Sequence, residues 1–400
     1  MPENWKTYRL ENIAKISGGK RMPKGQNLVE YETGHPYIRV RDMNTRTIRK
    51  SDLLYVPDPA FDKISRYIVE ENDIIISVVG TIGNIAIIDK NISGANLTEN
   101  CNKITELQNL DSSFLYYYLI SNIGQHEIAK GVVGSTQPKL PLYSIKDINL
   151  NLPPFAEQRA IANILSALDD KIENNLAMNK TLEDMAMSLY KHWFVDSGGK
   201  FENTLNDYVH LNPRLSIKKG EVATYVNMKA LPTEGMSVSE VDKVVVKGGA
   251  KYQNGDTLLA RITPCLENGK TAFVDFLTQD EIGFGSTEFL VLRAKDGISK
   301  YWVYCLSRDI NLVNHAVSCM IGTSGRQRVQ NDPFLQYELP ETDANLMKKF
   351  EIKVEPWFKK VKTNTTENQT LIQLRDTLLP KLISGEVRLR EFELQLAKVI

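Results

Sequence analysis

The feature that most constrains this chain is a long heptad pattern that occurs twice and is interrupted each time by asparagines. Apolar residues recur at alternating spacings of four and three. The pattern fails at Asn175 and Asn179 in the first copy and at Asn364 and Asn368 in the second. Heptad spacing predicts helices that pair along an apolar seam. Each copy therefore predicts a long helix with two amides in the middle of its seam.

The length of these helices predicts their partner. A helix of roughly 40 residues extends about 60 Å, so it overhangs a small domain and its apolar stripe must meet another long helix. Antiparallel pairing of the two copies would bring the amides of one helix to those of the other. A buried amide pair weakens a coil but fixes its register, because any slip leaves amides unpaired. The alternative, that the amides mark a solvated face, stays open at this point.

The segments before each helix also repeat. Three pairs of stretches carry the similarity: Asn72–Ser77 with Gly255–Ala260, Ala86–Asp89 with Ala272–Asp275, and Gly134–Gln137 with Gly322–Gln327. An internal repeat of this size predicts two copies of one unit. We expect an α+β fold in which two mixed α/β globular domains, residues 1–153 and 198–340, alternate with antiparallel coiled-coil helices in residues 154–197 and 341–400, the last range including a C-terminal tail.

Local chemistry predicts the boundaries of these elements. Pro153 and Pro154 forbid helix before about residue 155, and the Ser-Gly-Gly cluster that begins at Ser197 forms a hinge. Pro356 predicts that the second helix begins near residue 356 or kinks there, and Pro380 predicts a further distortion. Residues 73–88, rich in Ile and Val, predict strands, whereas residues 111–120 and 300–306 predict capped amphipathic helices.

Composition excludes several classes of protein. The chain has 400 residues, of which 42% are hydrophobic and 24% are charged, and its formal net charge is zero. No run reaches the roughly 18 apolar residues of a membrane span, and the first residues lack the apolar core of a secretory leader. Four cysteines without C-x-x-C spacing predict reduced thiols and a cytoplasmic location. A neutral chain would hold nucleic acid by local patches only.

The sequence predicts no catalytic site and no cofactor or metal bound by this chain. A G-x-x-x-x-G-K-[ST] loop is absent, and the five histidines are scattered without H-x-x-x-H spacing. Asn212-Pro213-Arg214 is a weak match to the N-P-P-Y loop of amino-methyltransferases, but an arginine replaces the second proline, and we interpret it as a turn.

Basic and amide side chains gather at a few places in this neutral chain. Residues 20–50 contain eight Lys or Arg against three Asp or Glu. Arg, Asn and Gln make the bidentate contacts that read base edges, while Lys more often contacts phosphate. Ordinary solvated loops are the alternative interpretation. The candidate DNA-binding residues are Lys20, Arg21, Lys24, Arg39, Arg41, Asn44, Arg46, Ser135, Thr136, Gln137, Lys139, Lys218, Lys219, Arg261, Arg326, Gln327 and Arg328.

The whole pattern resembles the specificity subunit of type I restriction–modification systems. The most specific stretch is Leu-Pro-Pro-Phe-Ala-Glu-Gln-Arg-Ala-Ile at residues 152–161, supported by residues 168–175, 189–194, 211–215 and 379–385. The second repeat departs from the pattern, because it lacks Glu-Gln after its Leu-Pro. Roles assigned to Glu157 and Gln158 therefore do not carry over to residues 341–346.

The resemblance implies a function and a set of partners. Each globular domain would be a target recognition domain for one half of a two-part DNA site, and the paired helices would set the distance between the halves. Two modification subunits that bind S-adenosylmethionine, and restriction subunits that use ATP and Mg²⁺, would be the partners. Candidate partner and spacer residues are Glu157, Gln158, Asn175, Asn179, Trp193, Phe194, Asn364 and Asn368, with Met178, Met185 and Met187 as further exposed anchors. Packing against the sister helix is the alternative for these apolar residues.

Two other classes of function compete with this one. A coiled-coil scaffold that binds only proteins would share the helices but would show no preference among DNA sequences. A self-contained methyltransferase or nuclease would need an N-P-P-Y loop or a P-D…(D/E)-x-K set, and neither is present.

Overall fold

The structure is a computed structural model that describes residues 2–43, 46–196, 198–323 and 325–388. The chain divides into two compact units. Unit 1 comprises Met1–Lys171 and Leu371–Ile400, and unit 2 comprises Ile172–Thr370. The division passes through both long helices, so each unit contains a part of each helix.

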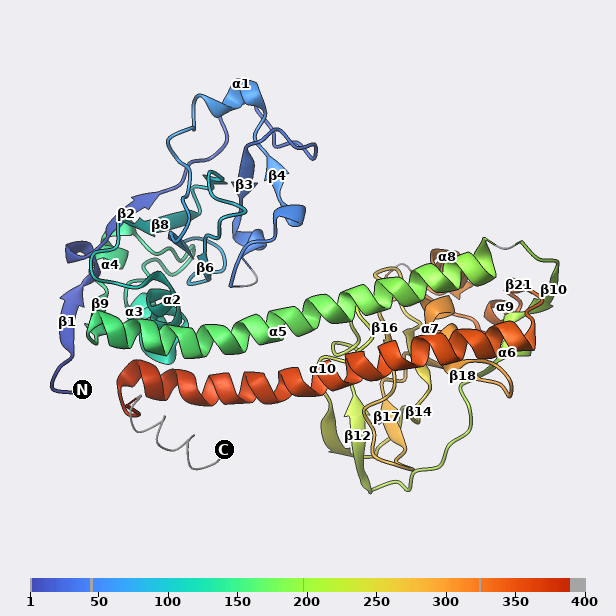
Figure 1. Cartoon of the computed structure of the whole chain (residues 1–400). Helices are drawn as coiled ribbons and strands as arrows, with labels where there is room; N and C mark the ends of the chain where they lie inside the picture. Colours follow the sequence, from blue (N-terminus) through green and yellow to red (C-terminus); the bar gives the residue numbers. More distant parts are fainter. Residues whose placement is uncertain (1, 44–45, 197, 324, 389–400) are drawn as a thin grey trace. The chain divides into compact units, whose positions relative to one another are not determined.

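In the described residues of unit 1, small sheets and short helices precede the first long helix (Figure 1). The strands are β1 Lys6–Arg9, β2 Lys15–Gly18, β3 Pro36–Ile38, β4 Leu54–Tyr55, β5 Ile74–Ser77, β6 Ile85–Ile87, β7 Asn96–Leu97, β8 Cys101–Thr105 and β9 Asn149–Leu152. The helices are α1 Asp58–Phe61, α2 Ser112–Ile120, α3 Asn122–Lys130, α4 Leu142–Lys146 and α5 Phe155–Tyr190. The sheets have the orders β2-β8-β5-β6, β4-β3-β7 and β1-β9.

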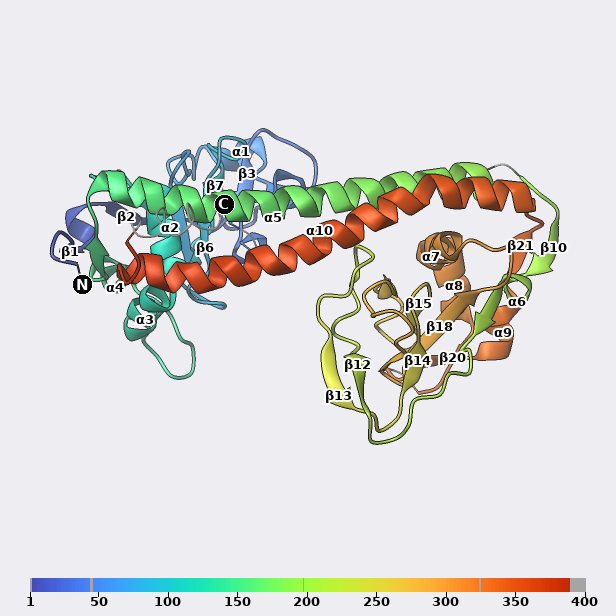
Figure 2. The same ribbon diagram turned by 60° about the horizontal axis from the view of Figure 1, so that its bottom comes forward.

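Unit 2 repeats this architecture (Figure 2). Its strands are β10 Phe201–Thr204, β11 Val209–Leu211, β12 Val222–Val226, β13 Asp242–Val245, β14 Ala250–Tyr252, β15 Thr257–Ala260, β16 Thr271–Phe273, β17 Gly283–Gly285, β18 Phe289–Ala294, β19 Met320–Ile321, β20 Arg328–Val329 and β21 Glu338–Pro340. Its helices are α6 Leu205–Tyr208, α7 Lys300–Arg308, α8 Ile310–Ser318, α9 Asn331–Leu335 and α10 Ala344–Ser384. The sheets have the orders β11-β18-β15-β16, β13-β12-β17-β14, β10-β21 and β19-β20.

The strand pairings confirm the internal repeat. Strand β5 lies antiparallel between β6 and β8, and β15 lies antiparallel between β16 and β18. The parallel pair β3–β7 in unit 1 corresponds to the parallel pair β12–β17 in unit 2. Even the turns agree, because Asn72 and Gly255, which precede β5 and β15, both have positive φ. The expected strands within residues 73–88 and the expected helices after Asp111 and Ser299 are all present.

The asparagines in the seam of the long helices bond to each other, as predicted. Within unit 2, Asn175 Nδ2 donates to Asn368 Oδ1 at 2.8 Å, and Asn364 Nδ2 donates to Asn179 Oδ1 at 2.8 Å. From one pair to the next, the residue number rises in α5 and falls in α10, so the two helices are antiparallel here (Figure 1). Asn175, Asn364 and Asn368 are buried, which excludes the solvated-face interpretation for these three residues.

Of the two alternatives predicted from Pro356, a helix start near residue 356 is wrong. Helix α10 begins at Ala344 and includes both Pro356 and Pro380. Both prolines lie on the exposed face of the helix. The carbonyl groups that lose a helical hydrogen bond at a proline can therefore bond to water, which lowers the cost of each break. The apolar seam on the opposite face, including Phe350 and Val354, is buried and begins before Pro356.

Buried and partly buried hydrogen bonds join each unit to its part of the long helices. In unit 1, Asp169 of α5 accepts from the Tyr117 hydroxyl of α2 at 2.7 Å and from Arg375 of α10 at 2.8 Å. In unit 2, Glu183 of α5 accepts from the Tyr304 hydroxyl of α7. Burial raises the pKa of both tyrosines, so both hydroxyls keep their protons and act as donors.

Candidate nucleic-acid interface

The loop after β2 carries the first group of candidate residues in unit 1. Its path is fixed by the backbone N–H of Lys20, which donates to the Leu97 carbonyl at 2.8 Å. A Cβ atom at Gly19 would lie 2.1 Å from the Thr98 carbonyl oxygen, so only glycine fits at this close approach. Lys20, Arg21 and Lys24 are all exposed. This loop therefore presents three cations on a closely packed backbone.

The second group in unit 1 is held by carboxylates. Arg39 forms a two-point ion pair with Asp42, with distances of 2.9 and 2.8 Å. Arg46 pairs with Asp170 of α5, which places it against the long helix. Arg41 lies exposed on the 3-10 turn Val40–Asp42. Asn44 lies outside the described residues.

A glycine-hinged loop between α3 and α4 carries the third group. Gly134 has a φ of +91°, and the backbones of Val133 and Lys139 bond to each other at 2.9 and 3.0 Å. These bonds close the loop at its base. The side chains of the loop are exposed: Ser135, Thr136, Gln137 and Lys139.

Unit 2 has its glycine-hinged loop at the same place, between α8 and α9. Gly322 has a φ of +142°, and the strands β19 and β20 close the loop. This hairpin packs beside the end of β15, because Val329 N donates to the Arg261 carbonyl at 3.0 Å and Arg261 Nη2 donates to the Val329 carbonyl at 2.8 Å. Arg261, Gln327 and Arg328 are thus brought together, and Arg326 is exposed beside them.

Lys218 and Lys219 lie elsewhere in unit 2. They precede β12 and are exposed, and Gly220 N donates to the Val246 carbonyl at 3.2 Å, which extends the β12–β13 ladder toward them. The structure describes no contact that joins these lysines to the Arg261 group.

Two acidic residues near these cations were missed by the sequence analysis. Glu99 pairs with Arg21 at 2.9 Å, and Glu288 pairs with Arg328 at distances from 2.7 to 3.0 Å. Glu99 lies in the turn before β8, and Glu288 lies in the turn before β18. In chain order, each of these strands is the last of its sheet. Their positions were a weak signal, because Glu99 lies two residues before Cys101 and Glu288 lies directly before Phe289, and these two residues begin corresponding strands.

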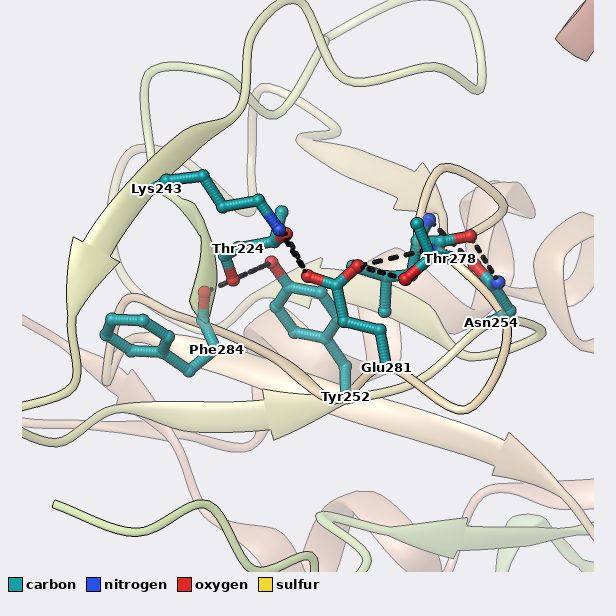
Figure 3. Close-up of polar contacts among 8 residues, drawn as sticks. Thr224, Lys243, Tyr252, Asn254, Thr278, Glu281 and Phe284 are labelled. Carbon is teal, nitrogen blue, oxygen red and sulfur yellow. Dashed lines mark hydrogen bonds and ion pairs between the residues drawn. The ribbon is translucent and has the colours of Figure 1, made fainter. Parts of the chain in front are cut away.

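A polar cluster around Glu281 holds the loop between β16 and β17 in unit 2 (Figure 3). The Glu281 carboxylate accepts hydrogen bonds from Lys243 at 2.7 Å, from the Thr278 hydroxyl at 2.8 Å and from the Thr224 hydroxyl. Tyr252 lies beside this cluster and donates to the Phe284 carbonyl at 3.0 Å. Burial opposes ionisation of Glu281, but these hydrogen bonds outweigh it and lower the pKa of Glu281 to about 2.

We expect Glu281→Gln to destabilise unit 2 by about 2 kcal/mol at pH 7, because hydrogen bonds to a charged acceptor are lost. The pKa of Glu281 is depressed in the folded state, so its stabilisation is present above its ordinary pKa near 4.5 and is lost as the pH falls toward 2. The difference between variant and wild type should shrink over that range. Urea unfolding of the full chain, followed by tryptophan fluorescence, measures it. The exposed Glu221→Gln is the control, and an unchanged difference at pH 3 would contradict the expectation.

The predicted partner residues divide into buried and exposed groups. Gln158 is buried and bonds to Asp111 N at 3.0 Å and to the Pro153 carbonyl at 3.0 Å, so it stabilises the start of α5 within unit 1. Phe194 is buried against Trp302 and Phe350, and its expected exposure is wrong. Its ring fills the core beneath the π-helical turn Lys191–Val195 that follows α5.

The other predicted partner residues range from exposed to partly buried. Met178 and Met185 are exposed on α5, whereas Met187 is partly buried. Glu157 pairs with Arg388 at 3.2 Å. Trp193 lines a shallow hollow of about 550 Å³ in unit 2 together with Lys349, Ile352, Lys353 and Trp357. A second hollow of about 510 Å³ is lined by Met185, Leu189, His192, Trp357 and three neighbouring residues of α5.

Within the described ranges, no three His, Cys, Asp or Glu side chains are grouped so that they could hold a metal ion. Over the same ranges, no helix combines the length and the apolar character needed to cross a membrane.

Comparison with known proteins shows which proteins this chain resembles. Residues 2–184 match the family described as "Type I restriction modification DNA specificity domain". The chain is 25% identical over 433 residues to the type I restriction enzyme MjaIX specificity subunit of Methanocaldococcus jannaschii, covering 98% of this chain and 95% of the relative. It is 24% identical over 482 residues to the HindI specificity subunit of Haemophilus influenzae, covering 96% and 100%.

A solved structure shares the fold. The S subunit of a type I restriction–modification system from M. genitalium superposes with a TM-score of 0.60 at 17% sequence identity, covering 95% of this chain and 96% of that chain. Its likeness extends over both repeated units and the long helices. The sequence matches along nearly the whole length show that the chain is similar to type I restriction–modification DNA specificity subunits.

Proposed function

We propose that this chain reads a two-part DNA site, with one half contacted by each unit. The observation that carries the proposal is the internal repeat, which includes the glycine-hinged loops at residues 133–139 and 321–328. These loops occupy the same place between corresponding helices, and both lie beside the end of the central strand of their sheet. Exposed Arg, Gln, Ser and Thr side chains on them are of the types that contact base edges and phosphates.

We further propose that modification subunits dock on the paired helices. Exposed Met178 and Met185, and the hollows beside Trp193 and Trp357, offer the apolar and aromatic surface that protein interfaces favour. In this proposal the partners bind S-adenosylmethionine, and restriction subunits use ATP and Mg²⁺, while this chain contributes recognition in the cytoplasm. A scaffold without DNA preference is disfavoured by the match of residues 2–184 to a DNA specificity domain.

A duplication of one recognition unit tests the two-part reading. A chain in which residues 200–340 are replaced by a second copy of residues 5–153 keeps both long helices. We expect it to recognise a site whose two halves have the same sequence, because both readers are then identical. Methylation profiling of host DNA, with the chain and its modification subunits expressed together, measures the site. The reciprocal chain, with two copies of residues 200–340, should give the other half twice. An unchanged, asymmetric site in both chains would refute the proposal.

A further inference from the structure

Two exposed arginines, Arg21 in unit 1 and Arg328 in unit 2, are each held by a carboxylate through the same side of the guanidinium group. Arg328 Nε lies 3.0 and 2.9 Å from the two carboxylate oxygens of Glu288, and its Nη2 lies 2.7 Å from Oε1. Arg21 Nε donates to Glu99 Oε1 at 2.9 Å. In both arginines the Nε–H is therefore committed to a glutamate.

The two glutamates come from corresponding turns of the internal repeat. In unit 1 the turn begins at Thr98, whose N–H donates to the Ile38 carbonyl, and in unit 2 it begins at Ser286, whose N–H donates to the Val226 carbonyl. Ile38 ends β3 and Val226 ends β12, which are equivalent strands. Glu99 and Glu288 are thus one and two residues into the same turn. The repeat places a carboxylate at this edge of each unit, although the paired arginines come from different loops.

The pairing leaves the outer end of each guanidinium group available. For the part of the chain that the structure describes, no protein acceptor is present for Nη1 of either arginine, and the side chains are 76% and 45% exposed. Nη1 and the second proton of Nη2 form a planar fork of two parallel N–H donors. This fork matches the O6 and N7 acceptors of guanine in the major groove.

Two other arginines form ion pairs in a more enclosed setting. Arg39 makes the same two-point contact with Asp42, but its Nη2 also donates to the Asp52 carbonyl at 3.4 Å, and its side chain is only 21% exposed. Arg293 pairs with Asp256, whose carboxylate is fully buried in the sheet. The side chains of Arg21 and Arg328 are therefore much more accessible than those of Arg39 and Arg293.

We propose that Arg21 and Arg328 each read a guanine base, and that Glu99 and Glu288 are positioning residues that hold the guanidinium groups in the reading orientation. This inference rests on the proposed function, because it assigns a base to each unit. An unsupported arginine would have to lose side-chain entropy on binding, whereas a carboxylate fixes its plane beforehand. The negative charge of the same carboxylate also repels a DNA phosphate that approaches the arginine. The arginine is therefore better suited to contact a base than to attract the DNA backbone.

The test uses the full chain assembled with its modification subunits. The recognised site is first determined by methylation profiling, and each guanine is then replaced by 7-deazaguanine, which lacks the N7 acceptor. We expect one guanine in each half-site to be sensitive, with binding weakened roughly 10- to 100-fold. Arg328→Lys should weaken binding to normal DNA by a similar factor, and 7-deazaguanine at the corresponding position should then cause no further loss. Arg21→Lys should do the same in the other half.

Variants of the glutamates separate positioning from folding. Glu288→Gln and Glu99→Gln should reduce the preference for guanine over adenine at one position each, while assembly with the modification subunits stays normal. Glu127→Gln, which alters an exposed ion pair with Lys130 on α3, is the matched control and should leave the preference unchanged.

The outcomes distinguish this inference from the function on which it rests. If the wild-type complex shows no preference among DNA sequences, the proposed function fails as well. If the wild-type complex is specific but the lysine variants keep full sensitivity to 7-deazaguanine at every guanine, only the assignment of Arg21 and Arg328 is wrong. A half-site without guanine overturns it in the same way.

Discussion

Arg308→Met is expected to lower the free energy of unfolding of unit 2 by about 4 kcal/mol. The Arg308 guanidinium donates to the carbonyls of Thr233 and Gly269, both at 2.8 Å, and to those of Thr271 and Gly235. Its Nε also donates to the Tyr304 hydroxyl, which in turn donates to Glu183. Methionine fills a similar volume but leaves several carbonyls without donors and removes the cation that faces a nearly buried glutamate.

Urea unfolding of the full chain, followed by tryptophan fluorescence, measures this loss, because Trp193, Trp302 and Trp357 all belong to unit 2. The exposed Arg214→Met is the control and should shift the midpoint little. Adding Glu183→Gln to the Arg308→Met variant should recover about 1–2 kcal/mol, since the glutamine carries no buried charge. A loss below 1 kcal/mol in the single variant would show that these hydrogen bonds do not stabilise unit 2.

Insertion of seven residues into both long helices is expected to lengthen the gap in the recognised DNA site by about three base pairs. One heptad adds about 10 Å to a helix, and a base pair occupies about 3.4 Å along B-form DNA. The insertions belong after Lys171 in α5 and before Leu371 in α10, where the division between the units cuts both helices. A whole heptad keeps the seam on the same face, so the Asn175–Asn368 pair can still form.

Methylation profiling with the modification subunits present gives the length of the gap. Insertion into α5 alone is the matched control. This insertion shifts the register of α5 against α10 between the Asp169–Arg375 and Asn175–Asn368 contacts, so at least one of the two contacts must break. Specific methylation should then be lost. If the doubly lengthened chain methylates the original site with an unchanged gap, the helices do not determine the half-site separation.

Much of the fold could be predicted because the seam is periodic. The amides, the strand pairs around Ile74 and the capped helix after Asp111 all depend on spacing, which a sequence displays directly. The start of α10 could not be predicted in this way. Pro356 is a strong local signal against helix, but it lies on the exposed face while the seam opposite is buried, and tertiary packing outweighs the local preference.

The candidate interface was less predictable than the fold. Residue type identified Arg39 and Arg46 as possible readers, but only the structure shows that Asp42 and Asp170 hold them. Glu288 could be selected only by its position before β18, because its partner Arg328 is distant in the chain and is brought near by the hairpin of β19 and β20. Contacts between loops depend on backbone paths, which spacing alone does not reveal.

The core of unit 1 has a consequence for synthesis on the ribosome. Leu382 and Ile383, near the end of α10, pack in the same cluster as Trp5 and Leu10. At typical translation rates, roughly 10–40 s pass between completion of the first part of unit 1 and emergence of its second part. The first part of unit 1 must avoid aggregation over that interval, because its core is still incomplete. Unit 2 is continuous in sequence and can fold before the second part of unit 1 emerges.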